Sequence, residues 1–152
     1  MEPLLTPEIR SAIGRSLPPL KVEVHRSDIR KYAVATGQRL RKYTDGDEAP
    51  PLLLFGLFRP VVPRERMRPD GIQEDTALIP VLPLKRIMAG GVETEYHRPI
   101  RAGDVLVATQ RLVELYEKEG SSGPLIFIVT ENRVETEAGD LVAVERTTRI
   151  AR

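Results

Sequence analysis

The stretch AGGVETEYHRPIRAGDVL, from Ala89 to Leu106, decides the fold. Residues 92–97 alternate Val, Thr and Tyr with Glu, Glu and His, which predicts a β-strand with one buried and one exposed face. Gly90 and Gly91, just before it, permit either a positive φ or a close approach of the backbone to another group. Pro99 has no N–H for a ladder hydrogen bond, so the strand is expected to end before it.

The remainder of the chain reads as an antiparallel meander. Pro99 and the Gly–Asp pair at 103–104 together predict a tight turn, which we call the proline corner. Beyond it, β-prone runs alternate with turn signals, which is typical of hairpins. We expect strands at Val105–Tyr116, Leu125–Thr136 and Leu141–Ile150, separated by a Gly- and Ser-rich loop at Glu117–Pro124 and a turn at Glu137–Asp140.

The N-terminal half predicts short helices around one strand. Its first helix has Thr6 as the N-cap and Pro7 at the first helical position. The following elements are a strand at Leu20–His25, a helix at Asp28–Thr36 capped by Ser27 and ended by Gly37, and a polar loop at Gly37–Ala49. Helices come first and strands follow, so the predicted class is α+β.

Residues 52–58, LLLFGLF, follow two prolines and are apolar on every side. Leucine and a preceding proline pair favour a short helix over a strand. A helix that is hydrophobic all round must be covered on all sides, and the C-terminal strands are the elements available to wrap it. Leu54, Phe55 and Phe58 are therefore core residues by default.

The composition excludes several classes of site and partner. The 152 residues suit one domain, 1–152, and the absence of cysteine excludes disulfides and thiolate sites and fits a reducing compartment. A net charge of +1 gives no indication of a nucleic-acid or membrane-surface partner. No apolar run approaches the roughly 20 residues of a membrane span, and the N-terminus lacks a signal pattern, so we expect a cytoplasmic protein. His25 and His97 are far apart and predict no metal site.

Two stretches carry a resemblance to a known family. GGVETEYHRPIRAGD, from Gly90 to Asp104, and VHRSDIRKYAVATG, from Val24 to Gly37, resemble the MaoC-like dehydratases. They are most similar to the FAS1-like dehydratase half and its stand-alone relatives, such as the A subunit of 3-hydroxyacyl-ACP dehydratase. The resemblance covers Leu20 to the C-terminus and implies a hot-dog fold, in which an antiparallel sheet wraps around a helix.

The resemblance also implies a reaction and shows where this chain departs from it. Active members of the family hydrate trans-2-enoyl thioesters, or run the reverse reaction, with an Asp and a His in a GDxNPxHxD motif. Laid on this chain, the motif falls on Gly37–Asp45, with Gln38 in the Asp slot, Leu40 and Arg41 in the Asn–Pro slots and Tyr43 in the His slot. Glutamine does not titrate, and tyrosine with a pKa of about 10 is a poor base at neutral pH. The chain is expected to lack the catalytic pair.

Such a chain resembles the non-catalytic half that shapes the acyl and CoA groove beside a catalytic half. The implied ligand is an acyl-CoA or acyl-carrier-protein thioester, and the implied partner is a second hot-dog chain, in a homodimer or a heterodimer with a catalytic MaoC-like chain. No cofactor is implied. The candidate substrate-binding residues are Leu54, Phe55 and Phe58 beside the acyl group, and Arg64, Arg66 and Arg68 for phosphate, with plain surface charge as the alternative for the arginines.

The sequence leaves open several other functions for the chain and several other roles for single residues. A homo-oligomeric acyl-CoA-binding module without catalysis is the alternative function, and a thioesterase would need an acid near the central helix, where only Glu48 is available. His97 is either a substitute base or a solvent-facing side chain. Asp45 and Asp47 are either a carboxylate pair or turn residues, and Asp104 is expected to fix its turn. The length of the acyl group and the direction of the reaction are not encoded in these motifs.

Overall fold

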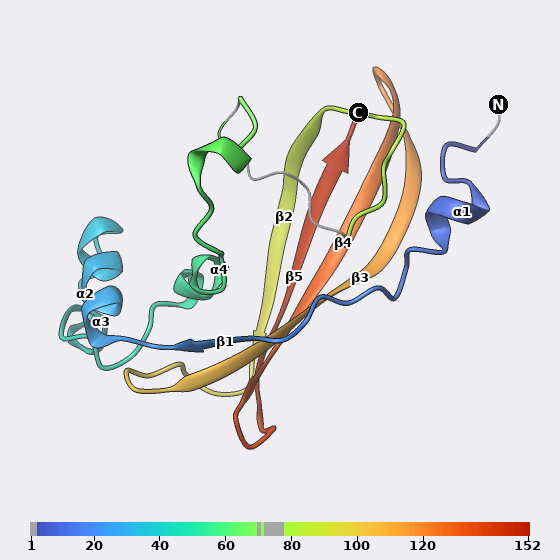
Figure 1. The fold of residues 1–152 in the computed structure, drawn as a ribbon. Coiled ribbons are helices and arrows are strands. Elements are labelled where there is room, and N and C mark those ends of the chain that lie inside the picture. Colours follow the sequence, from blue (N-terminus) through green and yellow to red (C-terminus); the bar gives the residue numbers. More distant parts are fainter. Residues whose placement is uncertain (1–2, 70, 72–77) are drawn as a thin grey trace.

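The computed structural model describes residues 3–69, 71 and 78–152, which form a five-stranded antiparallel sheet with short helices (Figure 1). The strand order is β1-β3-β4-β5-β2. Helices α2 and α3 lie toward one end of the sheet and α1 toward the other. The elements are α1 (Pro7–Arg10), β1 (Leu20–Glu23), α2 (Arg26–Ala35), α3 (Arg41–Thr44), η1 (Pro51–Leu53), α4 (Leu54–Leu57), η2 (Arg64–Arg66), β2 (Ile87–Tyr96), β3 (Val105–Gly120), β4 (Gly123–Thr136) and β5 (Leu141–Ala151).

The predicted meander is confirmed, with one correction. Strands β3, β4 and β5 pair in sequence as antiparallel neighbours. The loop expected at Glu117–Pro124 is wrong, because β3 continues to Gly120 and pairs there with Gly123. Stacking of the Tyr116 and Phe127 rings, with centroids 4.7 Å apart, stabilises the hairpin beyond the predicted strand end.

The strand of the opening stretch is β2, which pairs with β5 at the edge of the sheet. Its register shifts between Ala89 and Gly91, where a β-bulge forms. A Cβ atom on Gly90 would lie 2.9 Å from Cγ2 of Thr148 and 3.0 Å from its carbonyl oxygen. The close backbone approach expected at the glycine pair is therefore confirmed.

The proline corner is held by Asp104. Its carboxylate accepts two hydrogen bonds from the Arg98 guanidinium, at 2.8 and 3.3 Å, and one from the Arg101 N–H at 2.8 Å. The Asp104 N–H in turn donates to the Arg101 carbonyl at 3.1 Å. Asp104 thus closes the turn that leads into β3, as the sequence indicates.

Asp104→Asn is expected to destabilise the protein in a pH-dependent way. Burial raises the pKa of Asp104, but the hydrogen bonds and charges of Arg98 and Arg101 outweigh this effect and hold the pKa below its usual range. The stabilisation is therefore fully present above the unfolded pKa and is lost as the pH falls through the folded value. Chemical denaturation should show a deficit of about 1.5–3 kcal/mol for the variant at pH 6, shrinking below about pH 4. An equal deficit at pH 6 and pH 3 would contradict this account.

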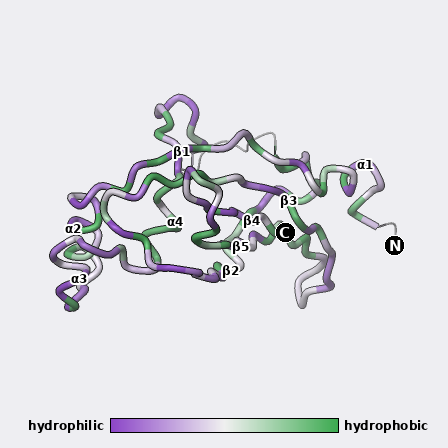
Figure 2. Tube along the Cα trace, turned by 90° about the horizontal axis from the view of Figure 1, so that it is seen from below, coloured by the Kyte–Doolittle hydropathy of each residue, from purple (hydrophilic) through white to green (hydrophobic). Residues whose placement is uncertain are grey.

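The apolar segment 52–58 forms η1 and α4, which lie on one face of the sheet (Figure 2). Leu54 is 1% exposed, but Leu52 is 63% and Phe55 38% exposed. The prediction of a helix buried on every side is therefore wrong for this chain: the helix buries one face, because the sheet covers it from one side only.

Two apolar clusters cover this face, which we call the inner face. The first joins the helices to one end of the strands and includes Ile29, Leu54, Leu106, Ala108, Val134 and Ala143. The second covers the other end of the strands with the N-terminal segment and residues 78–82, and includes Leu5, Leu78, Leu82, Leu112, Ile128 and Ala151. In β4 both clusters use even-numbered residues, so both lie on the same face.

The helices at the N-terminal end differ from the predictions in detail. The Thr6 cap of α1 is confirmed, since its side chain accepts a hydrogen bond from the Ile9 N–H at 3.3 Å. Helix α2 begins at Arg26 with His25 at the cap position, rather than after a Ser27 cap. The segment predicted as a loop contains the short helix α3. No helix in the described ranges is long and apolar enough to cross a membrane.

Candidate functional site

The segment between α2 and η1 holds the two positions where the family motif has its catalytic pair. Gln38 follows the C-terminal end of α2 and is half-buried, and its N–H donates to the Ala33 carbonyl at 2.9 Å. Tyr43 lies in α3 and is also half-buried. The structure therefore anchors both positions close to α2.

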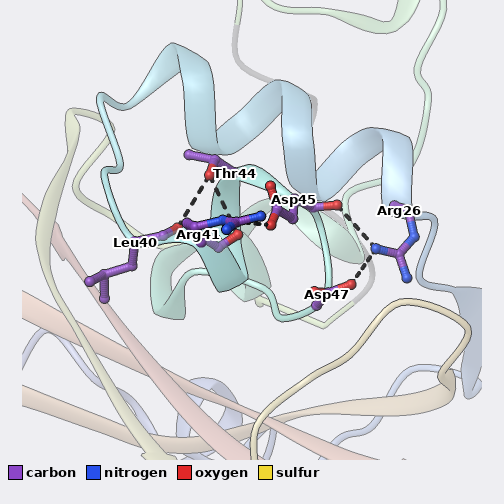
Figure 3. A network of polar contacts seen from close by, with 6 residues as sticks. All are labelled: Arg26, Leu40, Arg41, Thr44, Asp45 and Asp47. Atoms are coloured by element: carbon purple, nitrogen blue, oxygen red, sulfur yellow. Dashed lines mark hydrogen bonds and ion pairs between the residues drawn. The ribbon is translucent and has the colours of Figure 1, made fainter.

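A polar network fixes this segment against α2 (Figure 3). The Arg26 guanidinium donates to the Asp45 carbonyl at 3.0 Å and pairs with the Asp47 carboxylate. Arg41 Nε lies 3.3 Å from Asp45 Oδ2. The carboxylates of Asp45 and Asp47 thus bind different arginines, which favours the turn interpretation over a catalytic carboxylate pair.

A cavity of about 350 Å³ opens beside this segment. It brings together α3, the residues before η1, the end of β2 and the proline corner. Its lining includes Tyr43, Glu48, Pro51, Tyr96, His97 and Ile100, whereas Gln38 is not part of it. The structure therefore places one of the two motif positions at a cavity.

Three polar side chains of this cavity have partners within the chain. Glu48 forms an ion pair with Lys42 at 2.8 Å. His97 Nε2 lies 3.4 Å from Glu95 Oε1, and its side chain is 40% exposed. The Tyr96 hydroxyl donates to the Pro51 carbonyl. Burial, together with the charges of Glu145 and Tyr32, raises the pKa of Tyr96 to about 12, so this hydroxyl remains a donor at neutral pH. The cavity can hold a polar group but presents no Asp–His pair.

The six candidate binding residues do not gather in one cavity. Leu54 belongs to the core, and Phe58 packs against the same cluster. Phe55 is partly exposed, with the Arg59 guanidinium 4.4 Å from its ring centroid. Arg64 and Arg66 are exposed on η2.

Arg68 lines a second cavity, of about 380 Å³, at the other end of the sheet. Lys85 and Arg149 are its other cationic residues, and Ile79, Leu84 and Ile128 are among its apolar ones. An apolar cavity with basic residues at its wall suits an amphipathic anion. Of the three predicted arginines, only Arg68 lies at one of these two cavities.

Sequence reasoning missed Glu145 in β5. It is 6% exposed, and burial raises its pKa, partly opposed by the charge of Arg59. Alternation along β5 offered no signal for it, because the strand has apolar residues in both phases, such as Val142 and Ala143. In the described residues no group of histidine and acidic side chains could hold a metal ion.

Comparison with known proteins supports the resemblance. The family model for the FAS1-like, dehydratase domain region matches residues 11–145. A UPF0336 protein of Streptomyces coelicolor is 29% identical over 154 residues, covering 94% of each chain. Mesaconyl-C(4)-CoA hydratase of Chloroflexus aurantiacus is 32% identical over 79 residues, which are 52% of this chain. The match spans 28% of that hydratase, so this chain corresponds to only part of it.

Solved structures share the fold at low sequence identity. The ChsH1-ChsH2 complex of Mycobacterium tuberculosis has a TM-score of 0.69 at 18% identity, covering 95% of this chain and 86% of that chain. The HadBC (3R-hydroxyacyl-ACP dehydratase) complex of the same organism has a TM-score of 0.64 at 20% identity, with coverages of 92% and 97%. The (R)-hydratase of A. caviae has a TM-score of 0.57 at 14% identity, with coverages of 90% and 94%. The α+β hot-dog fold expected from the sequence is confirmed.

Proposed function

The chain belongs to the FAS1-like dehydratase family, among the MaoC-like hot-dog dehydratases, and we propose that it is the non-catalytic, acyl-thioester-binding subunit of an (R)-specific enoyl-CoA hydratase or 3-hydroxyacyl-thioester dehydratase. In this role it shapes the groove for the thioester while another hot-dog chain supplies the acid and base.

One observation carries the proposal: Gln38 and Tyr43 occupy the positions of the catalytic Asp and His. Hydration of an enoyl thioester needs a base that accepts a proton from water near neutral pH. The amide of Gln38 cannot do so, and a phenol with a pKa of about 10 is protonated at pH 7. Tyr43 can still orient a polar group from its place in the cavity wall.

The surface of the chain supports a second hot-dog subunit as partner. In the described sheet, β2 pairs on one side only, with β5, and Met88 and Val92 on it are 42% and 41% exposed. Leu52 on η1 is also exposed. An open strand edge beside exposed apolar side chains is a feature that dimerisation covers. The structural neighbours HadBC and ChsH1-ChsH2 are themselves complexes.

The relatives support a thioester ligand. Mesaconyl-C(4)-CoA hydratase is by its name a hydratase of a CoA thioester. We place the acyl group along α4, with Leu54, Phe55 and Phe58 on its path, and the phosphates of CoA or of a carrier-protein arm near Arg64, Arg66 and Arg68. Arginine suits this role because it binds phosphate bidentately.

The proposal predicts that the purified chain does not hydrate crotonyl-CoA. Loss of the enoyl absorbance should proceed at the uncatalysed rate for the wild type, and Gln38→Ala and Tyr43→Phe should leave that rate unchanged. His97→Asn serves as the control for a substitute base in the same cavity. Robust hydration by the wild type would refute the proposal. If Gln38→Ala or Tyr43→Phe abolished that hydration, the motif positions would be catalytic, and if only His97→Asn did, His97 would be the base.

A further inference from the structure

The face of the sheet opposite the inner face, which we call the outer face, presents two ordered rows of side chains. The helices and the N-terminal segment pack on the inner face through the two apolar clusters, and the described residues form no third cluster on the other side. In β4 the odd-numbered residues belong to the outer face, because side chains alternate along a strand. Register then identifies their neighbours on β3, β5 and β2, which lie side by side with β4 (Figure 1).

The first row is apolar. Its four side chains come from four neighbouring strands: Tyr116 of β3, Phe127 of β4, Ile150 of β5 and Met88 of β2. The two rings stack, and the Lys118 ammonium lies 5.4 and 5.2 Å from their centroids. Met88 is 42% exposed, and none of the four belongs to either cluster. Contiguous apolar side chains that face solvent are typical of an interaction surface.

The second row is charged and lies four residues further along β4, about 13 Å away. Its members, in the same strand order, are Arg111, Glu131, Arg146 and Glu93. Within the chain, Arg146 Nη2 lies 3.0 Å from Glu131 Oε2. Arg111, Arg146 and Glu93 are exposed. The sign of the charge alternates from strand to strand, so the two ends of the row carry opposite charges.

This pattern makes the outer face complementary to itself. A two-fold axis parallel to the strands, between β4 and β5, reverses the strand order and keeps each row at its own height. Arg111 then faces Glu93 of a second copy, and Glu131 faces Arg146 of that copy. The apolar row meets the apolar row of the second copy in the same way. Both rows are therefore matched by one arrangement.

A two-fold axis that runs across the strands gives no such match. An axis along the charged row places each charge against its own copy. An axis midway between the two rows brings the apolar row onto the charged one. Both arrangements are costly, because like charges repel and charges lose their hydration against apolar side chains. Charge complementarity thus selects the axis parallel to the strands.

The usual geometry of packed sheets keeps the charge pairs within reach. Two sheets that pack face to face lie about 10 Å apart, with their strands turned by about 30°. A row across four strands is about 14 Å wide. A turn of this size moves the ends of the row by only about 4 Å, which arginine and glutamate side chains can span.

We propose that the chain forms a homodimer through its outer face, so that the occupant of this face is a second copy of the same chain. The contact uses side chains of the outer face and leaves the backbone edge of β2 and the inner face free. It is therefore a second interface, additional to the one that joins a hot-dog partner at the β2 edge. Two copies joined in this way can each keep such a partner. The inference does not rest on the proposed function, since no ligand takes part in it.

Reversing the charges at the two ends of the row tests the proposal by sedimentation equilibrium. Glu93 and Arg111 lie three strands apart, about 14 Å, so they do not meet within one chain. Glu93→Arg and Arg111→Glu each set like charges against each other at two symmetric contacts. Each should raise the dissociation constant of self-association about 10-fold or more. Both substitutions in one chain should restore the wild-type value, because the reversed charges again face opposite ones.

A mixture of the two variants gives an independent check. When the Glu93→Arg chain meets the Arg111→Glu chain, every end of the row faces a charge of opposite sign. A mixed dimer should therefore form at concentrations where each variant alone has dissociated. Glu8→Arg makes the same charge change at an exposed position of α1 and should leave self-association unchanged. Circular dichroism should show the wild-type fold for all variants, because the three positions are exposed.

Three results would overturn the inference. The first is a wild type that stays monomeric at every concentration. The second is an unchanged dissociation constant for both single variants, which would place any self-association elsewhere, such as at the β2 edge. The third is a weakening that neither the double variant nor the mixture rescues, because the charged row would then not face its own copy. None of these results bears on thioester binding, so the proposed function stands or falls separately.

Discussion

Replacing Leu54 with alanine is expected to lower the free energy of unfolding by about 2–5 kcal/mol. Leu54 begins α4 and is 1% exposed, in the cluster that joins α2, α4 and the inner face of the sheet. Truncation leaves a cavity under the helix, and the packed strands below it can collapse only partly. Urea denaturation followed by circular dichroism measures the loss.

Leu52→Ala is the matched control, because it makes the same chemical change two residues earlier at a position that is 63% exposed. Its cost in the chain alone should stay within about 0.5 kcal/mol. Equal losses for Leu52→Ala and Leu54→Ala would contradict a helix that the chain covers on one face only. They would instead support the all-round burial expected from the sequence.

Gly46→Ala is expected to cost about 3 kcal/mol, for two reasons that add. The residue has φ +81°, a conformation that alanine adopts only with strain. The new Cβ would also lie 2.8 Å from the Arg26 carbonyl oxygen and 2.7 Å from Cγ of Arg30. The backbone atom cannot move without shifting the start of α2. The same denaturation experiment applies.

Gly37→Ala separates the two causes. Gly37 has φ +68°, but a Cβ there would meet nothing within 4 Å. This variant should lose only the conformational part, about 1 kcal/mol. If both variants lost the same amount, the new Cβ at residue 46 would not clash with α2, which would contradict the close approach of this turn to the helix.

The strands were predictable because their signal is local. Alternation from Val92 to Tyr96 and the Gly–Asp turn at Gly103 specify the pairing and the corner without help from distant residues. Helix α3 was not predictable, because Arg41–Thr44 has no apolar stripe. What fixes this segment comes from α2, through Arg26. The exposed side of the apolar helix was also unpredictable, since composition shows what would be buried but not how far the sheet reaches around it.

The candidate site likewise contains residues that the sequence could locate and one that it could not. Gln38 and Tyr43 could be located by motif spacing alone, because they lie within one short segment. Glu145 could not, since β5 carries apolar residues in both phases, such as Val142 and Ala143, and alternation does not identify its inner face. Its cross-strand neighbours, Asn132 of β4 and Thr94 of β2, come from two other strands and meet it only through register.

The central claim is that the chain binds an enoyl thioester without turning it over. Titrating crotonyl-CoA into the purified chain in a calorimeter tests both parts at once, because binding gives heat that saturates and hydration gives heat that continues after each injection. The account predicts saturable binding, no continuing heat, and only crotonyl-CoA in the recovered solution. Continuing heat with 3-hydroxybutyryl-CoA in the recovered solution would contradict it.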